Sequence, residues 1–425
     1  MTILTDRGEA APSARPRPDL SQLIHPIDLA AFQRDYWERQ PLVVHRSDPG
    51  YYADLLTLDD VDRILSLSNV RLGNLRVVVN GKETPVSALG SAGRNGAVNA
   101  LEELYGRYRT GSTVVLNALE LRWEPLQRLS RALGAEISAR FQMNIYLTPA
   151  GAQGFAPHYD MHDVFVAQVH GTKHWRLSSP PIALPLQGQP YDKSQPEPAP
   201  EQEFDLRAGD VIYLPRGTIH SATSNESASV HITIGVHPVL YAQVFTDAIQ
   251  ELFAEDVRFR RGLPVGFATD DSLRHQAAED FAELADVLRA RLLPEDMVAR
   301  SVTRATSMSA PTLRHHLTDL EELAELWVDT RVRRRPGQRW NITVTGDVVR
   351  LGFHNKLVQL PAHVADEVRY VAETNGAGFT ASDIPGDLDE PGRLVLVQTL
   401  LREGFLTIGC PAPYTHRQRQ GTNCQ

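Results

Sequence analysis

Two histidines and one aspartate are the residues of this sequence whose types and spacing could do chemistry. His158 and Asp160 stand two positions apart in PHYD, and His220 follows in PRGTIH. Side chains two positions apart on a strand point to the same face, so His158 and Asp160 can reach one metal ion together. Two imidazoles and one carboxylate bind one face of an octahedral ion and leave the opposite face open.

Fe(II) is the ion that this mixed nitrogen and oxygen donor set predicts. The open coordination positions accept a bidentate co-substrate and dioxygen together, as in the non-heme iron oxygenases. The chain has 15 histidines, so an isolated HxD pair could arise by chance. Here the pair precedes a predicted strand hairpin at 163–177 and the element GDVIYLPRGTIH at 209–220, and this context favours a metal site. His158, Asp160 and His220 are therefore the predicted metal ligands and catalytic centre.

The sequence around these three residues is typical of an antiparallel β-fold. Short alternating segments are separated by turns rich in Gly, Pro and Asp, which indicates a barrel or a double-sheet roll. The Pro- and Gln-rich segment 180–200 is predicted to be a surface loop near the mouth of that roll. The predicted strands of the roll are 141–147, 163–170, 173–177, 204–206, 211–214 and 229–236.

The segment resembles the JmjC and cupin-type oxygenases that use 2-oxoglutarate, and more narrowly the ribosomal oxygenase subgroup, which hydroxylates ribosomal proteins. The resemblance implies a double-stranded β-helix, or jelly-roll, core. It also implies hydroxylation coupled to the conversion of 2-oxoglutarate and O2 into succinate and CO2. The matching segments are PHYD at 157–160, HDVFVAQVHGTKHWRL at 162–177, GDVIYLPRGTIH at 209–220 and, nearer the N-terminus, DYWERQPLVVHR at 35–46.

The same resemblance implies residues for 2-oxoglutarate. Lys173 matches the position at which the family places a basic residue for the far carboxylate, and strand parity turns Lys173 inward and Arg176 outward. Asn144 matches a family position near the metal-bound end of the co-substrate. Thr233 lies on the last strand, where it is expected to line the same pocket.

The chain as a whole is predicted to be a mixed α and β protein with several parts. Beyond the roll the apolar period changes from two to 3.6, which indicates helices, one of them at 310–330. The apolar faces of these helices need a partner, and a homodimer formed through the helical block is expected. The predicted parts are a disordered N-terminus (1–19), a catalytic domain with N-terminal helical elements (20–240), a helical domain (241–335), a winged-helix-like domain (336–412) and a flexible tail (413–425).

Charge and composition exclude several functional classes. The net charge is −9, and residues 361–409 hold eight acidic and three basic side chains, a net −5, so DNA binding by the winged-helix-like domain is not expected. No run of about 18 apolar residues predicts a membrane span, and the N-terminus lacks the apolar segment of a signal peptide. Only Cys410 and Cys424 are present, which fits a reducing cytoplasm.

Three functions stay open at this point. The first is hydroxylation of a ribosomal protein, and the second is hydroxylation of a free amino acid, a peptide or a natural product. The third is a metal-binding cupin without catalytic activity, against which Lys173 argues because a roll that only binds metal does not need this cation. The sequence leaves open the hydroxylated atom, the oligomeric state and the role of the 180–200 loop.

Overall fold

The chain folds as two compact units, Met1–Pro238 and Val239–Gln425, each considered separately. The computed structural model describes residues 2–6, 19–67, 75–79, 82–84, 96–192, 194, 198–310, 313–374 and 378–409. Both cysteines, the predicted tail and most of the predicted disordered N-terminus lie outside these residues. Within the described ranges, no helix has both the length and the apolar character needed to cross a membrane.

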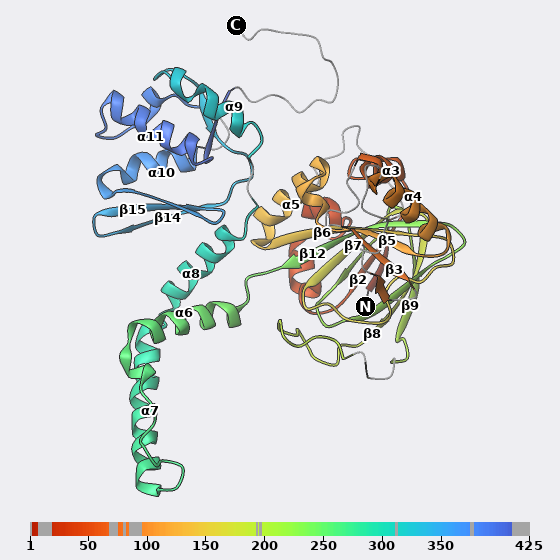
Figure 1. Ribbon diagram of the computed structural model, residues 1–425, viewed down its shortest axis with the longest axis horizontal. Coiled ribbons are helices and arrows are strands. Elements are labelled where there is room, and N and C mark those ends of the chain that lie inside the picture. Colours follow the sequence, from red (N-terminus) through yellow and green to blue (C-terminus); the bar gives the residue numbers. More distant parts are fainter. Residues whose placement is uncertain are drawn as a thin grey trace. The chain divides into compact units, whose positions relative to one another are not determined.

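The first unit is a roll of two facing sheets, which confirms the predicted fold class (Figure 1). The larger sheet has nine strands in the order β1-β2-β10-β7-β12-β6-β5-β3-β4, and the smaller has three in the order β11-β8-β9. The strands are β1 (Thr2–Asp6), β2 (Leu42–Arg46), β3 (Leu75–Val79), β4 (Lys82–Thr84), β5 (Thr113–Leu116), β6 (Arg140–Thr148), β7 (Asp163–His170), β8 (Thr172–Ser178), β9 (Gln202–Arg207), β10 (Val211–Leu214), β11 (Ile219–Ser224) and β12 (Ser229–His237).

Alternating side chains give the larger sheet two apolar faces. On β7, Val164 and Val166 point into the roll and pack with Trp175 of the smaller sheet. Phe165 and Ala167 point the other way, into a core that the helices share. This alternation follows from the strand pleat, in which successive side chains point to opposite faces of the sheet. A polar side chain that points to the inner face can therefore contact a ligand inside the roll.

Helices cover the outer face of the larger sheet (Figure 1). One of these helical segments begins where the Asp28 side chain caps a short α-helix, which continues directly as a π-helical turn. Phe32 of that turn packs on Phe165 and Tyr213, with ring centroids 5.7 and 5.0 Å away. The helical elements are α1 (Leu20–Ile24), α2 (Leu29–Ala31), η1 (Phe32–Tyr36), α3 (Leu58–Leu67), α4 (Gly96–Arg109), η3 (Leu119–Leu121) and α5 (Glu124–Ile137).

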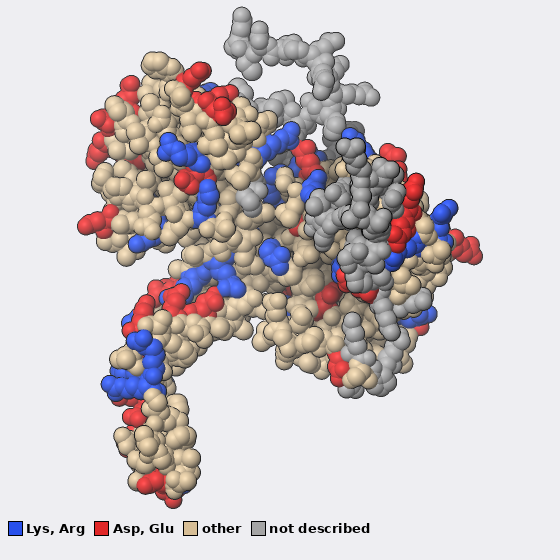
Figure 2. Space-filling model, viewed as in Figure 1, with Lys and Arg blue, Asp and Glu red and all other residues tan. Residues whose placement is uncertain are grey.

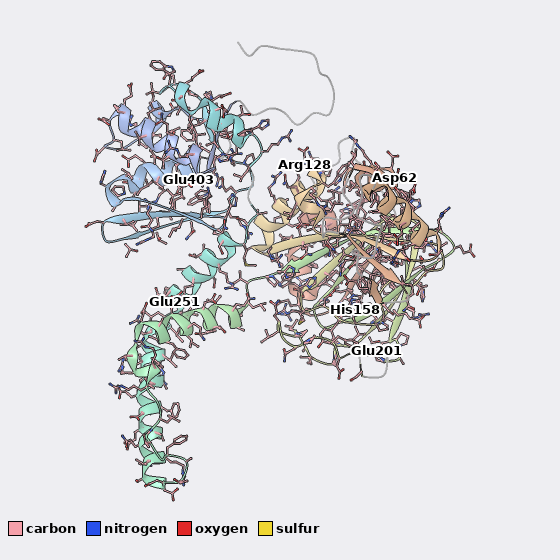
Figure 3. The ribbon with its side chains drawn as sticks, in the orientation of Figure 1. Asp62, Arg128, His158, Glu201, Glu251 and Glu403 are labelled. Carbon is pink, nitrogen blue, oxygen red and sulfur yellow. The ribbon has the colours of Figure 1, made fainter. Side chains whose placement is uncertain are left out.

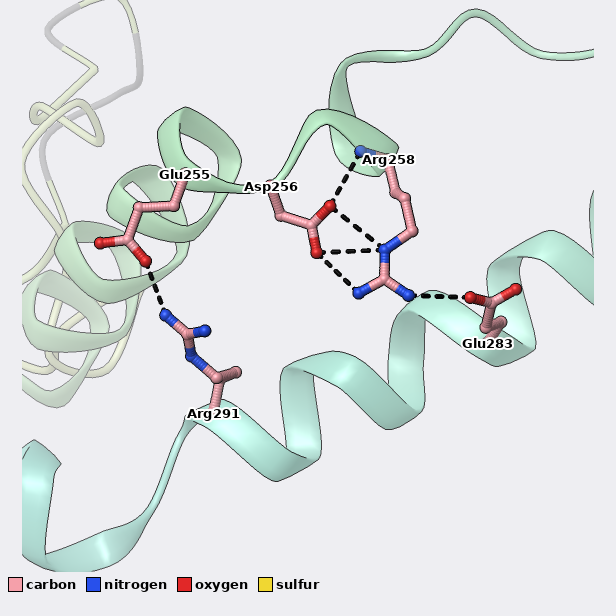
Figure 4. Close-up of polar contacts among 5 residues, drawn as sticks. All are labelled: Glu255, Asp256, Arg258, Glu283 and Arg291. Atoms are coloured by element: carbon pink, nitrogen blue, oxygen red, sulfur yellow. Dashed lines mark hydrogen bonds and ion pairs between the residues drawn. The ribbon is translucent and has the colours of Figure 1, made fainter.

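The second unit begins with the predicted helical block, in which few side chains are buried. Its elements are α6 (Tyr241–Glu255), η4 (Val257–Arg260), α7 (Asp271–Arg291) and α8 (Pro294–Ser307). Arg291 of α7 donates to Glu255 at 2.6 Å, and Arg258 links Asp256 to Glu283 (Figure 4). Positive and negative side chains alternate over this block (Figure 2). Exposed pairs of this kind contribute only about 0–1 kcal/mol each.

The C-terminal part of this unit has its own apolar core around Phe353 and Phe405. The predicted helix at 310–330 is reduced to α9 and one 3₁₀ turn, and β13 and β16 were not predicted. A winged-helix arrangement stays an interpretation. The elements are α9 (His316–Glu321), η5 (Glu322–Glu325), β13 (Val332–Arg334), β14 (Trp340–Thr345), β15 (Val348–Phe353), β16 (Lys356–Pro361), η6 (Ala362–Val364), α10 (Ala365–Glu373), η7 (Ala381–Asp383), α11 (Glu390–Arg402) and β17 (Leu406–Ile408).

A buried ion pair ties α9 to β17, and breaking it should unfold this part of the chain. Arg335 pairs with Asp319, whose Oδ1 also accepts from the Ile408 amide at 2.9 Å. Asp319→Ala should lower the free energy of unfolding by about 3–5 kcal/mol, because Arg335 stays buried without its counter-charge. Chemical denaturation measures this loss, and Asp366→Ala, at an exposed carboxylate, is the matched control. An equal and small effect of both substitutions would contradict the prediction.

Candidate functional site

The structure brings His158, Asp160 and His220 together within the first unit, where Figure 3 labels His158. One possible ligand atom from each lies within 4.8 Å of the others, and no other group of this kind occurs among the described residues. His158 and Asp160 were predicted on one strand or at a strand end, and they lie in the irregular segment before β7, where His158 forms an isolated bridge with His220. Their positions depend on long-range backbone bonds: His158 and His220 exchange N–H···O bonds of 3.2 and 2.8 Å, and Gly217 N donates to Asp160 O.

His220 turns its Nε2 toward the aspartate, and both histidines hold their Nδ1 against a backbone carbonyl. Nδ1 of His158 lies 2.8 Å from the Ala156 carbonyl, and Nδ1 of His220 lies 3.0 Å from the Thr218 carbonyl. A carbonyl oxygen can only accept, so each Nδ1 carries the proton and each Nε2 has a free lone pair. His220 Nε2 lies 3.8 Å from Asp160 Oδ2, a separation that an ion bound between them would span.

The electrostatics favour the ligating form of these groups. Burial, with the nearby His158, lowers the pKa of His220 to about 4, so its imidazole is neutral near pH 7. Burial acts to raise the pKa of Asp160, but His162 and the two other histidines outweigh it and the pKa is lowered. Asp160 is therefore a carboxylate, as a metal ligand must be.

Lys173 is a buried cation without a counter-ion. Its side chain is 2% exposed, and its Nζ donates to Thr148 Oγ1 at 3.1 Å. Among the described residues no carboxylate lies within ion-pairing distance of this nitrogen, and burial lowers the pKa of Lys173 to about 7. Arg176 on the same strand is exposed, as strand parity predicted. A charge held in this way needs an anionic partner, which a bound carboxylate could supply.

Asn144 and Thr233 lie side by side at the centre of the inner face. They are a register pair of β6 and β12. Asn144 Oδ1 accepts from the Ala118 amide at 3.0 Å, which leaves its Nδ2 protons without an acceptor among the described residues. The adjacent pair is His231 and Tyr146, whose rings stack at 4.8 Å. Asn144 and Thr233, the residues predicted to bind the co-substrate, thus lie next to the His231 and Tyr146 rings on the same face of the sheet.

This row, here called the β6–β12 ledge, includes residues to which sequence reasoning gave no role. Tyr146 lies two positions after Asn144 on β6, so its side chain points to the same face. The sequence alone could therefore have placed Tyr146 at the site. No direct contact with the metal or the co-substrate was predicted for His162 and His237, whose rings stack at 4.6 Å beside the triad. The register pairs of the ledge are His231–Tyr146, Thr233–Asn144, Gly235–Gln142 and His237–Arg140.

Aromatic rings close the triad on its other sides. Trp175 stacks on His220 with centroids 6.0 Å apart, and Phe155 lies 5.7 Å from His158. Arg76 lies over the Phe155 ring at 5.6 Å and donates to Asn117 at 3.0 Å. The Trp175 and Phe155 rings thus pack on the two imidazoles from outside the triad.

Comparisons with known proteins agree with the resemblance found in the sequence. Residues 118–244 match the JmjC domain family. The chain is 33% identical to ribosomal oxygenase 1 of Danio rerio over 274 residues, which cover 61% of this chain and 48% of that protein. It is 28% identical over 428 residues to the Dictyostelium discoideum protein named bifunctional lysine-specific demethylase and histidyl-hydroxylase NO66, covering 91% and 82% of the two chains.

The solved structures show the fold alone. The Escherichia coli ribosomal oxygenase YcfD aligns with a TM-score of 0.52 at 17% identity, covering 90% of this chain and 98% of that chain. Among the curated relatives, this chain spans 48% of the Danio rerio protein and 61% of the Gallus gallus ribosomal oxygenase 1.

Proposed function

We propose, from the premise that this chain contains a JmjC domain and is homologous to the ribosomal oxygenases, that it is a 2-oxoglutarate- and Fe(II)-dependent oxygenase that hydroxylates a side chain of a ribosomal protein. The observation that carries the proposal is a His–Asp–His triad inside a roll that also holds a buried lysine without a counter-ion. The triad by itself would be enough for a metal site. The buried lysine needs an anionic partner as well, and a co-substrate with a carboxylate would supply one.

The residues fit Fe(II). The ion would be held by Nε2 of His158, Nε2 of His220 and a carboxylate oxygen of Asp160, with the remaining positions open. The backbone carbonyls that accept from both Nδ1 atoms fix the ring orientations before any ion arrives. A structure of YcfD holds cobalt and 2-oxoglutarate, which supports the same two groups here.

The residues also fit 2-oxoglutarate. The Lys173 ammonium would bind the far carboxylate, assisted by the Thr148 hydroxyl that it already contacts. The Asn144 amide and the Thr233 hydroxyl would face the keto-acid end. When bound, the iron and co-substrate supply, with O2, the oxidising power to hydroxylate a C–H bond, and succinate and CO2 are the co-products.

The protein's own contribution is orientation and the exclusion of water. Asp160 would supply the negative charge that retains the ion, and His158 and His220 would each hold it through Nε2. Trp175 and Phe155 cover the imidazoles and keep bulk water from their outer sides. Lys173 sets the position of the co-substrate along the ledge, so that its other end reaches the triad.

The proposed function is tested by the intact masses of ribosomal proteins from cells with and without this protein. We expect one ribosomal protein to be heavier by one oxygen atom only when the protein is present. Equal masses for all ribosomal proteins, together with turnover on a free amino acid, peptide or natural product, would favour the second function. Absence of any 2-oxoglutarate turnover would favour a metal-binding cupin.

We also propose two properties of the whole protein. A homodimer formed through α6–α8 is supported by exposed apolar side chains on this block, such as Val298 at 64% and Phe281 at 59% exposure. A cytoplasmic location, without DNA or membrane partners, is supported by the charge balance and the cysteine content. Sedimentation of the purified protein tests the first property.

Binding of 2-oxoglutarate should take up a proton at slightly alkaline pH. The pKa of Lys173 is about 7 in the free protein, so at pH 8 the amine is mostly neutral. A bound carboxylate favours the ammonium form and raises that pKa again, so binding at pH 8 takes up nearly one proton and weakens as the pH rises further. Calorimetry in two buffers of different ionisation enthalpy measures the uptake. An identical heat in both buffers would contradict the role of Lys173.

A further inference from the structure

Given the proposed function, on which this inference rests, the metal ligands lie on two chain segments that meet at one turn. His158 and Asp160 precede β7, whereas His220 is the second residue of β11. The turn at 215–218 joins β10 to β11 and contacts both segments. Its position therefore decides where the three ligand side chains stand relative to one another.

Main-chain groups of this turn hold two of the ligands directly. The Gly217 amide donates to the Asp160 carbonyl at 3.0 Å. The Thr218 carbonyl lies 3.0 Å from Nδ1 of His220 and accepts its proton. The third ligand, His158, is tied to His220, since the two exchange backbone bonds of 3.2 and 2.8 Å. A displacement of the turn would therefore move all three ligands.

The loop that follows β8 packs against the same turn. Gly217 has a φ of 91°, a left-handed conformation that favours glycine. A Cβ atom at this position would lie 2.7 Å from the Ile182 carbonyl oxygen and 2.8 Å from Cδ of Pro185. The loop and the turn are thus in close contact, and the loop limits the positions that the turn can take.

A buried arginine anchors the turn to β7. The main-chain amide of Arg216 donates to Asp163 Oδ1 at 2.8 Å, and its Nη1 donates to Asp163 Oδ2 at 3.3 Å. The same Nη1 also donates to Glu38, so one guanidinium joins the turn to two carboxylates. Arg216 is only 7% exposed and Asp163 is completely buried, so water does not compete for these contacts.

This ion pair sets the spacing between the two segments that carry the ligands. Asp163, the first residue of β7, follows Asp160 by three positions. Arg216 precedes His220 by four positions on the other segment. Moving either partner would leave a buried charge unpaired, so the pair is held in one geometry. The ligand positions are thereby set before an ion binds.

We propose that Arg216 is a positioning residue for the metal site, which holds the 215–218 turn and, through the turn, the ligands Asp160 and His220. Arg216 is not itself a ligand, since its guanidinium is committed to two carboxylates. It acts by fixing the main-chain groups that orient the ligands. Its loss therefore lowers the affinity for a metal ion as well as the stability of the roll.

The roll contains a second buried arginine that allows these two effects to be separated. Arg46 is also 7% exposed, and it donates to the Leu23 and Gly209 carbonyls. Neither partner belongs to the segments that carry the metal ligands. Loss of Arg46 should therefore loosen the fold without displacing the ligands, whereas loss of Arg216 should do both.

Titration of the wild-type protein and two variants with Co(II) tests this role. Arg216→Met protein should bind Co(II) about 10–100-fold more weakly than the wild type, the usual effect of losing a group that orients metal ligands. Its visible Co(II) absorption spectrum should also change, because these bands depend on the geometry of the ligands. Arg46→Met protein should unfold at lower denaturant concentration, yet keep the wild-type affinity and spectrum.

A double variant covers the case in which the lone Asp163 carboxylate unfolds the Arg216→Met protein. Asp163→Asn/Arg216→Met removes both buried charges together, so neither is left uncompensated. The asparagine oxygen can still accept from the main-chain amide of the turn. This protein should fold, and it should show the same loss of Co(II) affinity and the same change of spectrum.

Three results would overturn the role of Arg216. The first is wild-type Co(II) affinity and spectrum in either folded Arg216 variant. The second is an equal loss of affinity in Arg46→Met protein, since any loosening of the roll would then be enough. The third is a double variant that does not fold, which would make the role of Arg216 purely structural.

The Asp160→Ala protein keeps this test distinct from the proposed function. If Asp160→Ala protein binds Co(II) as tightly as the wild type, the metal site itself is wrong and the role of Arg216 falls with it. If Asp160→Ala protein loses affinity and the Arg216 variants do not, only the role of Arg216 fails.

Discussion

Asp160→Ala protein should retain its fold but bind Co(II) or Mn(II) more than about a hundredfold more weakly, since even residues that only orient metal ligands change affinity by about 10–100-fold. The substitution removes the only negatively charged ligand and leaves two neutral imidazoles. Turnover of 2-oxoglutarate should fall below detection in the same variant. Metal affinity is measured by titration with either ion, and turnover by the succinate formed.

The fold should survive because Asp160 contributes little to it. Its side chain accepts no hydrogen bond among the described residues, and its one ion-pair contact there is with His220, at 3.8 Å. Asp205→Ala, which removes an exposed carboxylate of the same roll that pairs with His174, is the matched control and should leave metal binding unchanged. His158→Ala and His220→Ala should repeat the loss. Full turnover by any of the three variants would remove its residue from the site.

Lys173→Met should produce two opposite effects in one variant. The affinity for 2-oxoglutarate should fall by about a hundredfold or more, because losing one partner of a buried charge pair costs about 2–5 kcal/mol. The free protein should at the same time become more stable, because methionine fills a similar volume without a buried amine. Calorimetric titration and thermal unfolding measure the two effects.

The pH dependence of the stability difference shows whether the higher stability of the Lys173→Met protein comes from removing the buried amine. Burial shifts the pKa of Lys173 from 10.5 to about 7, so the unfolded chain binds a proton over this range that the folded chain does not. The contribution of a neutral Lys173 to stability is fully present above pH 10.5 and is lost as the pH falls to about 7. The shift corresponds to a few kcal/mol, as an order of magnitude.

The gain from Lys173→Met should therefore be largest near and below pH 7 and should shrink as the pH rises toward 10.5. Lys356→Met, at an exposed lysine that pairs with Glu403, should show no such profile. A Lys173→Met protein that is less stable than the wild type at pH 7, or that binds 2-oxoglutarate normally, would refute the assigned role.

Local patterns were enough to predict much of the roll and of the candidate site. Strand parity alone turned Lys173 inward and Arg176 outward, since successive side chains on a strand must alternate. The turn residues Gly171 and Thr172 predicted the hairpin between β7 and β8. Gly171 adopts a positive φ of 66° there, a conformation that favours glycine. The types of His158, Asp160 and His220 indicated the chemistry of the metal before any geometry was known.

Other elements could not be read locally. The strand β11, on which His220 lies, was missed because the turn-rich sequence before it hides its period. The expected helix at 310–330 is mostly absent, because a pattern of apolar residues does not specify whether a packing partner exists. The segment of His158 is irregular, and its position depends on backbone bonds to residues about sixty positions away.

The residue types and their alternation thus specified the kind of site, because both are properties of neighbouring positions. Which residues meet across the roll was specified by strand register, a property of pairs far apart in the chain. The register of β6 against β12 places Arg140 beside His237 and leaves the space over Gly235 for His162. No local period encodes that alignment, because it is selected by the burial of both sheets at once.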